Sequence, residues 1–97
     1  MSTISGYGFD GPYDINSDFN NLSGVYVIHD GNKCLDVGET GNLKERIPGH
    51  TRKACWKRNA GSGKTVKLEF LQVNDEQKRL EIESYLRAEL NPSCGEQ

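Results

Sequence analysis

Glu83 is the residue whose predicted position most clearly calls for a chemical explanation. At 100° per residue, the last predicted helix, which begins after residue 74 and runs to about residue 90, places Ile82, Leu86 and Leu90 on one apolar stripe. Glu83 projects from inside that stripe. A carboxylate on a core-facing stripe must be paired, protonated or bound to a metal ion, because burying an unpaired charge is costly. The alternative to a metal-binding role is an ion pair with Arg79, four residues earlier on the same face.

Side chains that can act in catalysis also occur at Tyr26, Asp36, Arg46 and His50. A guanidinium can neutralise an anion, and an imidazole can transfer a proton near neutral pH. Three of them have an equally simple structural interpretation: a strand aromatic for Tyr26, a solvated helix arginine for Arg46 and a lone surface histidine for His50. Arg46 and His50 would share one face of an unbroken helix, but Pro48 interrupts that spacing.

A basic stretch between Lys44 and Lys67 could contact an anionic polymer. It holds nine basic residues, His50 among them, against the single acid Glu45. The candidate nucleic-acid contacts in it are Lys44, Arg52, Lys53, Lys57, Arg58 and Lys64. Because the net charge of the chain is −2, DNA binding would need this local patch or a metal ion. A solvated polar face is the alternative interpretation of the same residues.

Length and composition limit the kind of site that the chain can build. Its 97 residues suffice for one domain, and only 34% of them are hydrophobic, with a mean hydropathy of −0.72. The core must therefore be thin. A shallow surface site suits such a chain better than a large closed pocket.

The three cysteines are Cys34, Cys55 and Cys94, an odd number without a CxxC pair. This pattern predicts no disulfide framework and no zinc site, and it favours a reducing compartment. No apolar run approaches the roughly 20 residues of a membrane span, and no signal peptide is recognisable. We therefore expect a cytoplasmic protein that does not contact membranes.

The chain divides into an arm and a folded domain. Residues 1–22 are rich in Gly, Ser, Asn and Asp and show neither helical nor strand periodicity, which predicts an irregular arm whose scattered aromatic rings could pin it to the core. Residues 23–97 form the predicted domain. Its strands are expected at 25–28, 33–38 and 66–73, the first two joined by a turn at Asp30-Gly31.

Capping signals place the helices of this domain. Asn42, with Glu45 three residues on, opens a helix that Pro48-Gly49 ends, and a second short helix runs through residues 54–56. Asn74 with Gln77 caps the last helix, which stops before Pro92. The expected order is strand, strand, helix, helix, strand, helix, in a mixed α/β domain.

Several elements in this order resemble the GIY-YIG nuclease family over residues 22–95. Gly24-Val25-Tyr26 matches the first signature tripeptide, and Asp36-Val37-Gly38 stands where the second belongs. The run from Gly38 to Arg46 reads Gly-x-Thr-x-Asn-Leu-x-x-Arg, which is more specific than either tripeptide, and His50 and the last helix follow. The resemblance implies an α+β fold with a small three-stranded antiparallel sheet flanked by helices.

The resemblance also implies phosphodiester hydrolysis with one metal ion at a shallow face of the sheet. Tyr26 would position or deprotonate the attacking water, and Arg46 would stabilise the charge that develops on the phosphate. Glu83 would hold Mg²⁺ or Mn²⁺. His50 would help in proton transfer or touch a phosphate.

Two residues depart from the family pattern. Asp36 replaces the second signature tyrosine, and a carboxylate cannot donate a hydrogen bond as a phenol does. It could add a metal ligand or impair the nuclease. Gly95 stands where an asparagine is frequent.

The expected function is therefore metal-dependent endonuclease cleavage of DNA. The alternative is a catalytically impaired nucleic-acid-binding or protein-interaction module with the same fold. No segment resembles an appended DNA-reading module, so a protein partner could target the domain to its substrate.

Overall fold

The sheet of this protein has five strands, all paired antiparallel. The computed structural model describes residues 2–95. The strands are β1 (Ser2–Ile4), β2 (Tyr7–Asp14), β3 (Gly24–His29), β4 (Cys34–Thr40) and β5 (Lys67–Gln72). Their spatial order is β1-β2-β5-β3-β4, so β3 lies between two partners and β4 lies at an edge.

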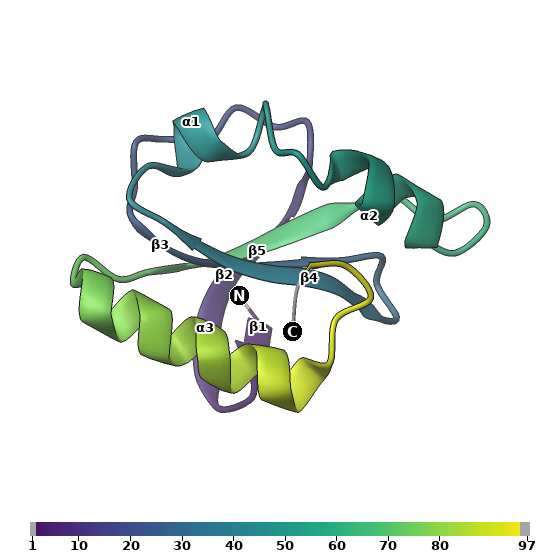
Figure 1. Cartoon of the computed structure of the whole chain (residues 1–97). Coiled ribbons are helices and arrows are strands. Elements are labelled where there is room, and N and C mark those ends of the chain that lie inside the picture. The colour runs from purple at the N-terminus through teal and green to yellow at the C-terminus, as the bar shows by residue number, and fades with distance from the viewer. Residues whose placement is uncertain (1, 96–97) are drawn as a thin grey trace.

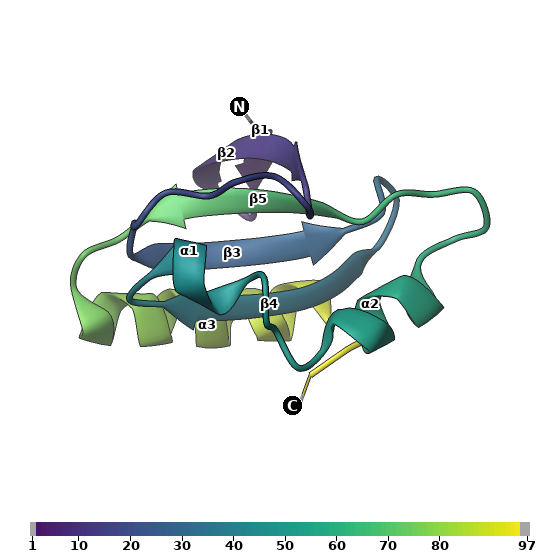
Figure 2. The same ribbon diagram turned by 90° about the horizontal axis from the view of Figure 1, so that it is seen from above.

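Three helices cover the two faces of the sheet. They are α1 (Leu43–Arg46), α2 (Lys53–Asn59) and α3 (Glu76–Leu90). Figure 1 shows α1 and α2 on one face and α3 on the other, and Figure 2 shows β1 and β2 at the far edge from β4. The α+β class with an antiparallel sheet and flanking helices is confirmed, whereas the predicted three-stranded sheet is wrong.

The prediction of an irregular arm over residues 1–22 is wrong for β1 and β2. These strands form a hairpin, and β2 pairs with β5 with a register shift between Asp10 and Tyr13. The strand was missed because only Phe9 of β2 is fully buried, so the strand shows no apolar alternation. Backbone pairing with β5, which the sequence does not reveal, holds it in place.

Alternation along β3 divides the core into two layers. Val25 and Val27 pack with Leu86 on the α3 side, whereas Tyr26 and Ile28 point toward α1 and α2. This is the pattern of a central strand buried on both faces, as its near-continuous apolar run predicts. Because side chains alternate, the same strand that builds the core also aims Tyr26 at the helix-covered face.

The helix ends follow the predicted signals with one exception. The Asn42 side chain accepts a hydrogen bond from the backbone N–H of Glu45 at 3.4 Å and caps α1, as predicted. The cap of α3 is Asp75, which accepts from the N–H of Gln77, so the predicted cap at Asn74 is wrong by one residue.

The turn between β3 and β4 has Gly31 at φ +96°, a conformation that glycine adopts readily.

The C-terminal segment folds back and is fixed by a disulfide. The N–H groups of Ser93 and Cys94 donate to carbonyls of Cys34 and Leu35 at the free side of β4, and Cys94 is bonded to Cys55 of α2. The expectation that the cysteines stay unpaired is wrong for these two, because their approach depends on a chain reversal after α3. The cysteines therefore give no support for a reducing compartment.

The described helices and the one free thiol among residues 2–95 complete the description of the fold. None of the helices in residues 2–95 combines the length and apolar character that a membrane crossing needs. Cys34 is a free thiol, and burial raises its pKa to about 11. It is therefore a poor nucleophile at neutral pH.

Replacing Cys55 and Cys94 by serine tests the contribution of the disulfide. The bridge joins positions 39 residues apart, so its loss frees a long loop in the unfolded chain. We expect the free energy of unfolding to fall by about 2–4 kcal/mol, measured by urea denaturation under non-reducing conditions. The Cys34→Ser control should change it by less than about 1 kcal/mol. Equal stabilities of the double variant and the wild type would contradict the expectation.

Candidate active site

A polar depression of about 600 Å³ is lined by residues from five parts of the fold, most of them charged. It is lined by Glu39, Arg46, Arg52, Glu83, Arg87 and Gly95. These residues come from β4, α1, the start of α2, α3 and the segment after α3. The depression contains two of the residues predicted for catalysis and metal binding, Arg46 and Glu83, together with one predicted nucleic-acid contact, Arg52.

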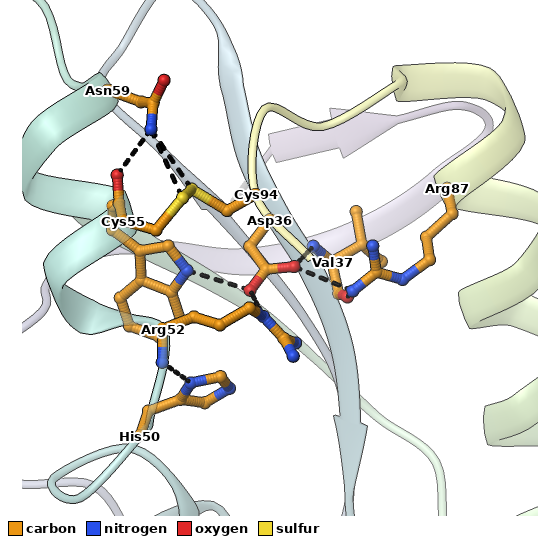
Figure 3. Close-up of a disulfide and its surroundings, with 9 residues drawn as sticks. Asp36, Val37, His50, Arg52, Cys55, Asn59, Arg87 and Cys94 are labelled. Atoms are coloured by element: carbon orange, nitrogen blue, oxygen red, sulfur yellow. Dashed lines mark hydrogen bonds and ion pairs between the residues drawn. A yellow bond between two sulfur atoms is a disulfide. The ribbon is translucent and has the colours of Figure 1, made fainter. Parts of the chain in front are cut away.

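Asp36 lies buried beneath this depression and accepts four hydrogen bonds. One carboxylate oxygen accepts from Arg87 Nη2 at 2.8 Å and from the backbone N–H of Val37 at 2.9 Å. The other accepts from Arg52 Nε at 2.7 Å and from Trp56 Nε1 at 2.9 Å. Figure 3 shows the carboxylate between the two guanidinium groups. With its lone pairs engaged in this way, Asp36 is poorly placed to serve as a metal ligand.

Tyr26 reaches across β4 toward His50. An ideal Cβ on Gly38 would lie 2.3 Å from the Tyr26 hydroxyl oxygen, so only glycine leaves room for the ring. The neighbour that requires a glycine at position 38 is therefore this phenol ring. At the far side of the glycine, the Tyr26 oxygen lies 2.9 Å from His50 Nε2.

The hydrogen bonds around His50 fix the direction of this contact. The backbone N–H of Arg52 donates to Nδ1 at 3.1 Å, so Nδ1 is an acceptor. Burial, with Arg46 and Arg52 nearby, lowers the pKa of His50 to about 4, so the ring is neutral at pH 7. A neutral imidazole has one N–H, which must then be on Nε2 and donate to Tyr26.

Tyr26 itself is fully buried. Burial raises the pKa of its phenol, and the neighbouring Arg46 guanidinium opposes that rise. The protonated phenol is therefore the dominant form at neutral pH. This favours a role in positioning a water molecule over a role as the base that removes its proton.

Glu83 faces the depression and has one loose partner. Its carboxylate lies 3.9 Å from Arg87 Nε, and burial raises its pKa. The alternative ion pair with Arg79 is wrong, because Arg79 Nε instead donates to Glu39 at 3.1 Å. The loosely paired Glu83 carboxylate is thus available to bind a cation.

The carboxylates present limit how a metal ion could be held. In residues 2–95 no three His, Cys, Asp or Glu side chains gather as a closed metal site. Mg²⁺ commonly binds through one or two carboxylates, with water and substrate phosphate completing its shell. Glu83, with Glu39 beside it, fits that open arrangement, so Mg²⁺ or Mn²⁺ would depend on Glu83 and on the substrate.

The other predicted nucleic-acid contacts do not line the depression. Lys44, Lys57, Arg58 and Lys64 are exposed, and Lys53 is partly exposed. Lys57 and Lys64 border a separate cavity of about 220 Å³ beside Asp14 and Asn16 of the N-terminal segment. The basic stretch is therefore divided between at least two surfaces.

Sequence reasoning missed Arg87 and Trp56 as parts of this site. Arg87 lies four residues after Glu83 on the same helix, a spacing that puts both on one face and could have revealed it. Trp56 lies on α2, which is too short for its sequence to show an apolar and a polar face. Its role depends on α2 packing against β4, which no local signal indicates.

Changing Asp36 to asparagine should destabilise the fold. The change removes the buried negative charge that pairs with both the Arg52 and the Arg87 guanidinium. We expect a loss of about 2–3 kcal/mol in the free energy of unfolding, since Arg52 is partly solvated and part of the penalty is screened. Chemical denaturation measures it, with Asp18→Asn as an exposed control that should stay within about 0.5 kcal/mol. A neutral result at Asp36 would mean that the arginines find other partners.

His50 should make stability depend on pH. Folding lowers the pKa of this base, so between pH 6.5 and about 4 the unfolded chain binds a proton that the folded chain does not. The contribution is fully present above pH 6.5 and is lost as the pH falls toward 4, by about 2 kcal/mol after allowance for screening. Denaturation at several pH values should show this slope for the wild type and a flatter one for His50→Gln. The same slope in both proteins would contradict the assignment.

Comparison of the chain with protein-family models, with curated proteins and with solved structures yields no match. The comparisons assign neither a family nor an activity. The function is therefore argued from the side chains of the depression and their chemistry.

Proposed function

We propose that this protein is a metal-dependent endonuclease that hydrolyses phosphodiester bonds in DNA. The observation that carries the proposal is the meeting of Arg46 and Glu83 in one open polar depression, although they come from helices on opposite faces of the sheet. A phosphodiester is anionic and repels nucleophiles, so a cationic group and a metal-binding carboxylate at one place suit its hydrolysis. The shared GIY-YIG-like motifs support the same chemistry.

Each side chain has a distinct task in the proposed reaction. Arg46 donates to the non-bridging phosphate oxygens and offsets the charge that develops on them. Tyr26 positions the attacking water, and the Nε2–H of His50 fixes the phenol oxygen. Glu83 would hold a divalent cation, whose charge would neutralise the phosphate and stabilise the leaving oxygen.

His50 is suited to positioning rather than to proton transfer. Its Nδ1 is occupied by the N–H of Arg52 and its Nε2 carries the proton donated to Tyr26, so the neutral ring has no free acceptor. At 5% exposure it also lies too deep to contact a phosphate directly. The proposed role of His50 is therefore to hold Tyr26.

A non-catalytic nucleic-acid-binding module is the second candidate. The observation that favours it is the complete burial of Tyr26, because solvent does not reach the phenol in this structure. Such a module would use the arginines of the depression to hold a strand without cleaving it. Cleavage and binding measured on the same DNA separate the two candidates.

The test is cleavage of supercoiled plasmid and of a branched DNA with Mg²⁺ or Mn²⁺. We expect Glu83→Gln and Arg46→Gln each to reduce the rate by about 100-fold or more, because each removes one source of positive charge at the phosphate. Glu81→Gln is the matched control, an exposed glutamate on the same helix, and should retain wild-type activity.

Two results would overturn the nuclease proposal. Cleavage that persists in Glu83→Gln would point to a contaminating enzyme. DNA retained in a gel shift without cleavage by the wild type would favour the binding module.

A further inference from the structure

We infer that Arg52 and Arg87, held by Asp36, form a binding subsite for a second phosphate group of the nucleic-acid strand. This subsite lies in the same depression as Arg46 and Glu83, which would engage the scissile phosphate. The inference rests on the proposed function. It adds that the substrate is a strand with at least two neighbouring phosphates and that Asp36 is a positioning residue.

The Arg52 guanidinium is fixed at one end and available at the other. Arg52 uses Nε to reach Asp36, and its two Nη groups make no hydrogen bond within residues 2–95. Its side chain is 30% exposed and lines the depression. A guanidinium with one edge anchored and the other open is preorganised to bind the oxygens of a phosphate.

Arg87 has a buried donor that lacks a partner. Its Nη2 donates to Asp36 and to the carbonyl of Val37, but its Nη1 is buried and finds no acceptor among the described residues. An unsatisfied buried donor is costly, and a ligand oxygen would remove that cost. Arg87 lines the depression, as does Gly95 beside this buried Nη1, so a ligand in the depression would lie near the donor.

The local charge favours an anion. Two guanidiniums share the single charge of Asp36, and Arg46 adds a further positive charge to the same depression. Of the two glutamates present, Glu39 is paired with Arg79. The other, Glu83, partly offsets Arg87. The four arginines of this network (Arg46, Arg52, Arg79 and Arg87) exceed its three carboxylates (Asp36, Glu39 and Glu83) by one, so the depression as a whole keeps one net positive charge.

Gly95 makes this arrangement possible. An ideal Cβ at this position would lie 2.7 Å from Arg87 Nη1 and 2.9 Å from Asp36 Oδ1, so a larger residue would displace the guanidinium. The two departures from the family pattern, Asp36 and Gly95, thus touch the same side chain. Asp36 cannot donate a hydrogen bond as a tyrosine would, but it recruits two arginines that can.

The experiment compares the binding of a thymidine dinucleotide and a thymidine trinucleotide in metal-free buffer with EDTA. The dinucleotide has one phosphodiester and the trinucleotide has two. Trp56 is the only tryptophan and donates to Asp36, so its fluorescence reports binding. For the wild type we expect the trinucleotide to bind about tenfold more tightly, since it occupies both subsites.

Substitutions locate the second phosphate. In Arg52→Gln and in Arg87→Gln the advantage of the trinucleotide should fall toward onefold, while Lys78→Gln, an exposed change on α3, should keep it. Asp36→Asn should reduce the advantage in the wild-type background and have no further effect in Arg52→Gln/Arg87→Gln. Such non-additivity would show that Asp36 acts through the two arginines. A general loss of stability would instead weaken binding in both backgrounds.

Two outcomes would overturn the inference. In the first, the wild type binds the trinucleotide and the dinucleotide equally tightly. In the second, Arg52→Gln/Arg87→Gln still binds the trinucleotide more tightly. Arg52→Gln keeps the inference testable if the Asp36 variant fails to fold, because Arg52 is partly exposed. The binding assay contains no metal and requires no cleavage. A nuclease that fails to cut can therefore still show the second subsite, and an active nuclease can lack it.

Discussion

The buried carboxylate of Asp36 is the interaction on which the rest of the site depends. It is fully inaccessible to solvent and receives hydrogen bonds from α2, from α3 and from its own strand. An isolated buried charge would be strongly unfavourable, so the carboxylate and its partners are stable only together. One edge strand thereby ties together helices that cover opposite faces of the sheet, and the polar depression lies where they meet.

The same constraint explains why a chain with a thin core can hold a defined site. The described core forms two clusters, one on each face, and of the segment after α3 it is Cys94 that belongs to one of them. At the edge of the sheet at β4, the Asp36 network and the Cys55–Cys94 bridge replace apolar packing and fix the start of α2 and the segment after α3. Directional bonds of this kind set side-chain positions more narrowly than apolar contact does.

Local signals predicted those parts of the fold that local physics determines. The alternation along Val25 to Ile28, the cap at Asn42 and the stop at Pro92 each depend on residues close in sequence, and the structure has the elements that they predict. The hairpin at β1 and β2 depends on a distant strand, and the disulfide on a chain reversal. Neither leaves a periodic trace in the sequence, so both were missed.

The candidate site shows the same division between local and distant information. Arg46 was recognised through motif spacing and Glu83 through its place on the apolar stripe of the last helix, and both line one depression. Asp36 was recognised as a departure from a pattern, but its consequence could not be deduced, because Arg52, Arg87 and Gly95 are distant in sequence and converge only in the fold. A carboxylate at a position where the resemblance leads one to expect a phenol thus gathers donors from other elements. Whether a departure from a motif abolishes chemistry depends on which side chains occupy the space around it.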